Sequence, residues 1–136
     1  MDADLQSGCE YYGYNFKRRI FKMVRKANIV QKQELGGGKG YAEVHEIVPE
    51  KDLYGHGRLY AKVVLKPNSS VGWHRHVGET EPYYILEGEG IFVDDDGSRT
   101  KVGPGDVCTI LPGQCHAIEN TSACKDLAFM ALIHKD

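Results

Sequence analysis

Four side chains with metal-binding chemistry stand at two places in the sequence. His74 and His76 are separated by one residue in the stretch GWHRHVGETE, Glu81 ends that stretch, and His116 lies forty residues beyond His76. On an extended strand, alternate side chains point to the same face, so both members of the H-x-H pair can reach one ion. In a helix the same pair would diverge by about 200°. The spacing therefore predicts a strand that offers two metal ligands.

Two glutamates follow the histidines, and the register of the next strand distinguishes between them. Glu81 directly precedes a β-favouring run, so that Glu81 and Tyr83 would share one face of a strand. Glu81 is therefore the predicted third ligand, whereas Glu79 lies nearer the turn and is expected to be solvated. Because a lone H-x-H pair is common among surface histidines, the site also needs His116 as its fourth ligand, from a distant strand.

The elements that must position these residues are expected to be short strands. Sixteen glycines fall at short intervals between runs that are rich in Val, Ile, Tyr and Phe. Short strands separated by turns about every 8 to 12 residues are typical of an antiparallel sandwich or barrel. The expected strands are residues 41–48, 58–66, 82–88, 90–93, 106–111, 116–120 and 126–133.

A glycine-rich segment at residues 36–40, GGGKG, precedes the first of these strands. It does not match a phosphate-binding loop, because Gly40 stands where a Ser or Thr is needed after the lysine. We therefore expect residues 36–40 to form a flexible turn.

The two histidine segments resemble the two sequence motifs of small single-domain cupins of type 2, which are jelly-roll proteins. The first motif, G-x5-H-x-H-x3,4-E-x6-G, is matched by His74, His76, Glu81 and Gly88. The second, G-x5-P-x-G-x2-H-x3-N, is matched by Gly105, Gly113, His116 and Asn120. Two turn positions depart, with Asn68 in place of the first glycine and Leu111 in place of the proline. The resemblance spans about residues 58–133.

The resemblance implies an all-β fold, an antiparallel double-stranded β-helix or jelly-roll barrel with an N-terminal extension. In such a chain, residues 58–136 are the barrel, and residues 23–57 are an N-terminal strand or strands with decoration. These N-terminal strands often exchange across a homodimer in such proteins, so a homodimer is expected.

Residues 1–22 combine aromatic and basic side chains without strand or helix periodicity, which predicts a poorly structured tail. RNA or a membrane surface is the alternative partner for such a basic aromatic arm. Met23 is an alternative translation start, which would make these residues an upstream extension.

Three imidazoles and one carboxylate suit one divalent transition metal ion per chain, and do not choose among Mn, Fe, Co, Ni, Cu and Zn. An octahedral ion would keep two positions open, which is typical of a catalytic or substrate-binding site. The alternative is a metal-free barrel whose histidines fill the core, which would leave buried polar groups unpaired.

The open positions lead to two hypotheses for function. The first is a metal-dependent enzyme of the oxygenase or isomerase type, which acts on a small organic molecule inside the barrel. The alternative is a non-catalytic, metal-dependent module that binds or senses a sugar or an organic acid. Strand parity gives Tyr83 and Gln114 as candidate catalytic residues, because they share faces with Glu81 and His116. Trp73 is expected outside the ligand face, and Cys115 as a buried apolar thiol.

Composition limits the other function classes. With 41% hydrophobic residues and a formal net charge of −2, the 136 residues give no basic excess that would predict a nucleic-acid or membrane partner. A small molecule is the expected partner. The four cysteines form no C-x-x-C pair, and reduced thiols fit a cytoplasmic protein, which is the expected location.

Overall fold

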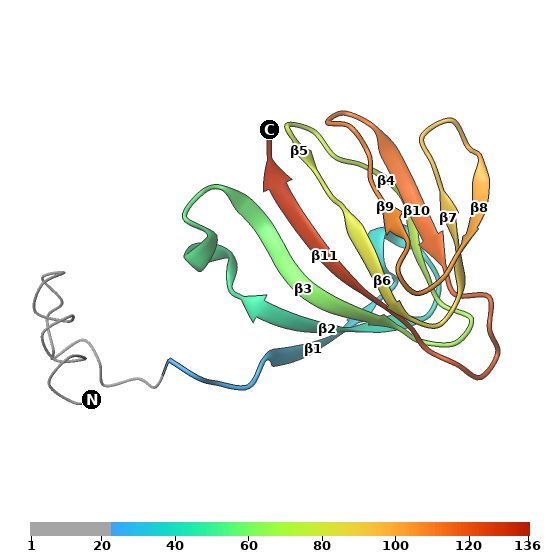
Figure 1. Cartoon of the computed structure of the whole chain (residues 1–136), viewed down its shortest axis with the longest axis horizontal. Coiled ribbons are helices and arrows are strands. Elements are labelled where there is room, and N and C mark those ends of the chain that lie inside the picture. The colour runs from blue at the N-terminus through green and yellow to red at the C-terminus, as the bar shows by residue number, and fades with distance from the viewer. Residues whose placement is uncertain (1–22) are drawn as a thin grey trace, which may run out of the picture.

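The computed structural model describes residues 23–136, which form two antiparallel β-sheets that face each other (Figure 1). The tail predicted for residues 1–22 lies outside the described residues. The first sheet contains β1 (Asn28–Gln33), β2 (Tyr41–Val48), β3 (Gly57–Leu65), β5 (Glu79–Thr80), β6 (Tyr83–Glu87), β9 (Val107–Cys108) and β11 (Leu127–Lys135). The second contains β4 (Ser70–Arg75), β7 (Gly90–Val93), β8 (Arg99–Val102) and β10 (Cys115–Glu119). Two 3-10 helices, η2 (Leu35–Gly37) and η3 (Glu50–Leu53), lie in the connections.

The chain crosses between the two sheets several times. The first sheet has the order β1-β2-β3-β11-β6-β9, with β5 paired to β11, and the second has the order β4-β10-β7-β8. Strands that follow each other in sequence, such as β3 and β4 or β9 and β10, therefore lie in opposite sheets. This arrangement is a jelly roll, so the predicted all-β fold is confirmed. Among the residues that the structure describes, no helix is long and apolar enough to cross a membrane.

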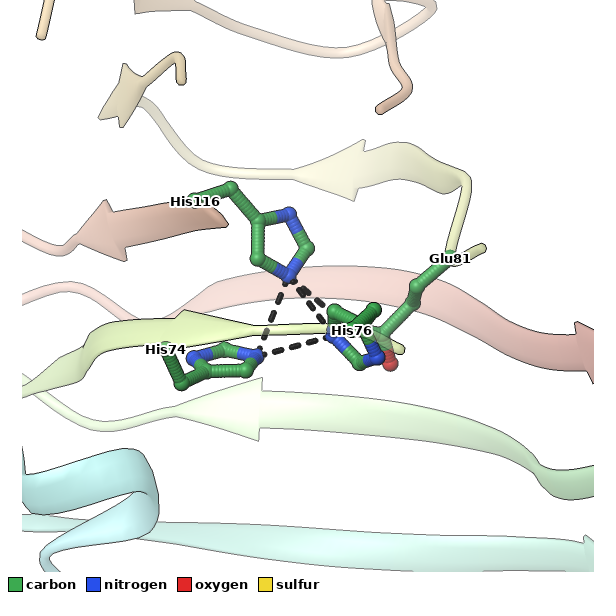
Figure 2. A group of neighbouring side chains, drawn as sticks. All are labelled: His74, His76, Glu81 and His116. Carbon is green, nitrogen blue, oxygen red and sulfur yellow. Dashed lines mark hydrogen bonds and ion pairs between the residues drawn. The ribbon is translucent and has the colours of Figure 1, made fainter. Parts of the chain in front are cut away.

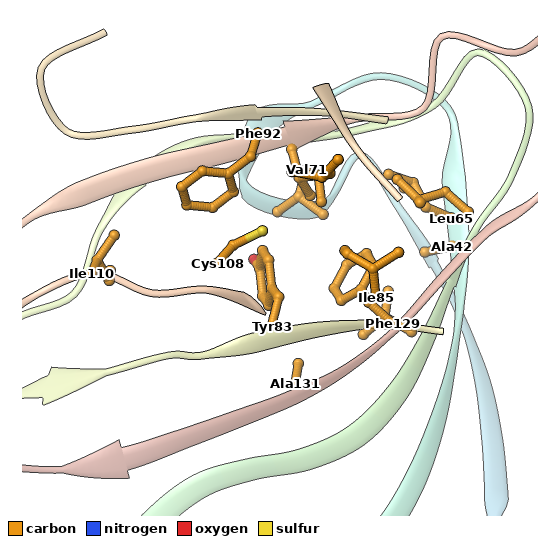
Figure 3. Packing of buried hydrophobic residues seen from close by; sticks show 14 residues of the cluster. Ala42, Leu65, Val71, Tyr83, Ile85, Phe92, Cys108, Ile110, Phe129 and Ala131 are labelled. Atoms are coloured by element: carbon orange, nitrogen blue, oxygen red, sulfur yellow. The ribbon is translucent and has the colours of Figure 1, made fainter. Parts of the chain in front are cut away.

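The core lies between the two sheets, where alternate side chains of both sheets meet (Figure 3). Tyr83 is its aromatic centre, with ring centroids 4.4 Å from Phe129 on the same sheet and 6.2 Å from Phe92 on the opposite one. Ile85 on β6 of the first sheet and Ile118 on β10 of the second are fully buried. Burial of apolar side chains from both layers stabilises the two sheets against each other.

The positions of β1 and β8 were not predicted from the sequence. All six residues of β1 are exposed, and three of the four in β8 are exposed, so neither segment carries the alternation of apolar and polar residues that marks a half-buried strand. The predicted strand 106–111 is shortened to the two residues of β9.

The glycine-rich segment forms a turn, as predicted, and this turn packs against β4. Two hydrogen bonds of 2.9 Å join the segments: Ser70 N–H donates to the Lys39 carbonyl, and Lys39 N–H donates to the side-chain hydroxyl of Ser70. A Cβ atom at Gly38 or at Gly72 would collide with the backbone of the opposite segment. The absence of side chains therefore lets residues 35–40 lie directly against β4, beside the histidine strand.

The two departures from the motif pattern lie in turns, as expected. Asn68 adopts a left-handed conformation with φ of 58°, which Asn tolerates better than most side chains.

Asn120, at the end of the second motif, is buried and stabilises the fold. Its amide donates to the carbonyls of Leu65, Lys66 and Lys125, which ties the loop after β10 to the end of β3.

Candidate metal centre

The four predicted ligands converge from separate segments of the barrel (Figure 2). His74 lies on β4 and pairs in register with His116 on β10. His76 follows the end of β4, and its backbone continues the pairing by donating to the Gln114 carbonyl at 3.1 Å. Glu81 lies between β5 and β6. One donor atom from each of the four side chains lies within 4.8 Å of the others, so the structure brings together all the residues selected from the sequence.

The spacing of the donor atoms fits a single metal ion. The Nε2 atoms of His74 and His76 are 3.0 Å apart, and each lies 3.1 Å from Nε2 of His116. Glu81 Oε1 lies 3.2 Å from Nε2 of His76 and of His116. Two ligands with bonds of about 2.1 Å stand about 3.0 Å apart at right angles and about 3.4 Å apart at the tetrahedral angle. The observed distances of 3.0 to 3.2 Å are therefore those expected of ligands that share one ion.

Two of the histidines have their outer nitrogen committed as a donor. His74 Nδ1–H donates to the Gly72 carbonyl at 2.6 Å, and His76 Nδ1–H donates to Glu79 Oε1 at 2.9 Å. Since both acceptors lack a proton, each neutral imidazole presents the lone pair of Nε2 to the centre. Two lone pairs that face each other at 3.0 Å repel unless a cation lies between them. The donor set thus fits a metal ion and does not fit a simple hydrogen-bonded core.

His116 is held by packing. Its side chain is completely buried, and its ring stacks on Tyr83 with centroids 5.1 Å apart and planes 22° from parallel. Among the described residues, its Nδ1 is a buried side-chain nitrogen without a hydrogen-bond partner. The ring therefore has no polar interaction on its outer side, and its polar contacts all point toward the other ligands.

The charges of the site are those that a metal centre needs. Burial opposes the ionisation of Glu81, but the contacts of its carboxylate with the imidazoles of His116 and His76 outweigh burial and lower the pKa of Glu81 to about 2. The nearby Glu81 carboxylate is also the main cause of a raised pKa at His76. Burial lowers the pKa of His74, which favours its neutral form. Glu81 is therefore ionised at neutral pH.

A cavity of about 390 Å³ is lined by three of the four ligands, His74, His76 and Glu81. Its apolar wall comes from the inner faces of both sheets and from η2. The residues of this wall are Leu35, Val44, Leu59, Val63, Val71, Phe129, Ala131 and Ile133. Tyr83 lines it next to the ligands, and the exposed residues Lys32, Glu50 and Arg58 contribute the charged part of the lining. The centre therefore faces a mostly apolar space with charged groups at its solvent side.

Glu79 was expected to be solvated, and this prediction is wrong. Its side chain is only 13% exposed, because it lies between His76 and Arg58. The i, i+3 spacing of His76 and Glu79 around Gly78 was the available signal, since Gly78 has φ of 70° and turns the chain back. No sequence signal identifies Arg58, which comes from β3.

The other selected residues divide between the cavity and the surface. Tyr83 lies in the cavity wall. The Gln114 side chain instead accepts the Leu111 N–H at 2.7 Å and closes the turn before β10. Trp73 is half exposed, and Cys115 is buried, as expected for both.

Comparisons with known proteins agree with this geometry. The sequence profile of the cupin domain matches residues 61–132. A Thermotoga maritima protein named oxalate-binding protein is 42% identical over 113 residues, which are 82% of this chain and 92% of that protein. A crystal structure of a predicted oxalate decarboxylase from the same organism has a TM-score of 0.77 and 39% identity, and covers 85% of this chain and all of that one. The polyketide cyclase RemF from Streptomyces resistomycificus, at 22% identity and a TM-score of 0.67, shares the fold over 86% of this chain and 81% of that one.

Removal of a ligand imidazole should remove the metal. We expect wild-type protein to hold one divalent ion per chain, and His74→Ala and His116→Ala to lose most of it, because each variant leaves only three of the four donors. Metal analysis by mass spectrometry after loading and desalting measures the content. His56→Ala, at an exposed histidine outside the cluster, is the matched control and should retain the ion. Full occupancy in both ligand variants would contradict the site.

Acid should release the metal through the imidazoles and not through Glu81. Protons compete with the ion for Nε2, and the raised pKa of His76 makes this competition begin above the usual histidine value of about 6.5. The carboxylate of Glu81 stays ionised down to about pH 2. A metal titration between pH 8 and pH 4 (about the histidine range) should therefore show affinity falling through the upper part of that interval. Constant affinity down to pH 5 would exclude imidazole ligation.

Proposed function

The chain is a member of the cupin family, and from this premise we propose that it binds a divalent transition metal ion and, through that ion, a small carboxylate anion such as oxalate. One observation carries the proposal: three imidazole nitrogens and one ionised carboxylate converge beside a cavity. The name of the oxalate-binding relative supports the choice of ligand.

The charge of the site favours an anion. A divalent ion held by three neutral imidazoles and one carboxylate keeps one net positive charge and offers its remaining positions to oxygen ligands. Oxalate has two adjacent carboxylates, which suit two neighbouring positions. Lys32 and Arg58 add positive charge to the cavity lining and Glu50 adds negative charge, while Glu79 already pairs with Arg58. The apolar wall weakens the screening by water and so strengthens the attraction.

Binding without turnover is favoured over an oxygenase or isomerase activity. General acid–base catalysis needs a group whose pKa lies near the working pH. Apart from the ligands, the titratable group in the buried wall of the cavity is Tyr83, and burial raises the pKa of Tyr83 well above its usual value. Lys32, Glu50 and Arg58 are exposed and line the solvent side. The non-catalytic alternative from the sequence analysis is therefore the function that we propose.

A second copy of the chain is the proposed partner of β1. This edge strand pairs only with β2, and all six of its residues are exposed, including Ile29 at 57% and Val30 at 36%. Unpaired edges with apolar side chains tend to associate with another chain. Because Lys32 of β1 also lines the cavity, association here would enclose the binding site as well as the edge.

Oxalate binding should require the metal. We expect calorimetry to detect oxalate binding to cobalt-loaded protein and to detect none after chelation of the metal or in His116→Ala, because no fixed cation then remains beside the cavity. Formate, which has a single carboxylate, is the control ligand and should bind more weakly. Carbon-13 NMR of labelled oxalate with the loaded protein should show an unchanged compound over hours. Metal-dependent conversion to formate and carbon dioxide would refute the binding-only function.

A charge on β1 should weaken the dimer. Sedimentation velocity should show wild-type protein as a dimer and Ile29→Glu shifted toward the monomer, because the carboxylate would have to be buried at the strand edge. Val107→Glu is the matched control, since Val107 is 63% exposed on β9 at the other edge of the same sheet. A monomeric wild-type protein, or equal behaviour of both variants, would contradict this arrangement.

A further inference from the structure

A chain of polar contacts connects the surface to one ligand of the centre. Arg58 on β3 forms two bonds to the Glu79 carboxylate, Nε to Oε2 at 3.1 Å and a terminal nitrogen to Oε1 at 2.6 Å. The same Oε1 accepts Nδ1–H of His76 at 2.9 Å. Both carboxylate oxygens are thus engaged, and three segments of the chain meet at Glu79.

We infer that Glu79, held by Arg58, is a positioning residue that fixes His76 as its Nδ1–H tautomer and thereby sets the metal affinity of the centre. The inference rests on the metal binding proposed above. It concerns a residue that lies outside the four ligands, in contact with the outer nitrogen of one of them.

The three ligand imidazoles differ in what supports them. His76 donates to an anionic carboxylate, His74 donates to the neutral Gly72 carbonyl, and His116 Nδ1 has no partner among the described residues. A negative acceptor makes the imidazole more basic at its other nitrogen and strengthens its bond to a cation. His76 is therefore the ligand whose metal bond depends most on its outer contact.

Arg58 determines the direction of the Glu79 carboxylate. A glutamate side chain has three rotatable bonds, and a single contact to His76 would leave its carboxylate free to turn toward solvent. The two-point contact with the planar guanidinium removes that freedom. Because the Glu79 side chain is 13% exposed and that of Arg58 is 51% exposed, water does not fully screen the contact on the histidine side.

A purely structural role is the competing explanation, in which the Arg58–Glu79 pair only ties β3 to β5. Glu79→Gln separates the two roles. Glutamine keeps the shape, and its Oε1 can still accept Nδ1–H, but the negative charge is lost. Glu79→Ala removes the acceptor altogether. A structural role predicts changes in thermal stability alone, whereas positioning of His76 predicts changes in metal affinity and in the tautomer.

The experiment is a Co²⁺ titration of the full chain, combined with nitrogen-15 NMR of the His76 ring in the metal-free protein. We expect Glu79→Ala to weaken Co²⁺ binding by about 10- to 100-fold and Glu79→Gln by less. Arg58→Ala should weaken it in the same direction, and the double variant should be no weaker than Glu79→Ala, because both residues act through one contact. The NMR spectrum should show protonated Nδ1 in the wild type and mixed tautomers in Glu79→Ala.

The matched control is Glu119→Gln, which disrupts a similar two-point pair with Arg99, at 2.7 and 2.9 Å, that contacts no ligand. Its Co²⁺ affinity should equal that of the wild type. Equal affinity and an unchanged His76 tautomer in Glu79→Ala would overturn the inference while leaving the metal site intact. Failure of the wild type itself to bind Co²⁺ would overturn the inference together with the proposed function.

Discussion

Three imidazole nitrogens that face one another at 3.0 to 3.1 Å are the constraint on which this structure depends. The Nε2 lone pairs of His74 and His76 repel, and the adjacent Glu81 carboxylate would be costly to bury without a positive partner. A cation converts the same arrangement into a set of favourable bonds. The barrel therefore has to hold four donors rigidly enough that an ion, and not a rearrangement of the side chains, relieves the repulsion.

Each of the three imidazoles is held in place by a different kind of contact. The glycine contacts that pack residues 35–40 on β4 fix the strand whose Gly72 carbonyl orients His74. The turn at Gly78 brings Glu79 back to His76. Register pairing of β10 with β4 and the stacked ring of Tyr83 hold His116. Backbone spacing, a charged contact and aromatic packing thus each support one imidazole.

His74 and His76 could be predicted as a pair because strand alternation is a local property: one-residue spacing places both on one face whatever surrounds them. The spacing of short strands and turns predicted an antiparallel sandwich or barrel, and the resemblance to cupins implied the jelly roll. The contacts that hold the ligands in place could not be predicted from strand alternation. Arg58 meets Glu79 across 21 residues of sequence, and the packing of Gly38 on β4 depends on a contact between separate segments. The strand β1 was missed because both of its faces are exposed and it carries no burial pattern.

Anomalous X-ray diffraction at the cobalt absorption edge, from crystals of the cobalt-loaded protein, would show directly whether the four side chains bind a metal ion. The account predicts one strong anomalous peak per chain at about 2.1 Å from Nε2 of His74, His76 and His116, with the Glu81 carboxylate also bound. Cobalt that is present in the crystal but bound elsewhere, with the three imidazoles still facing one another and no peak between them, would contradict it.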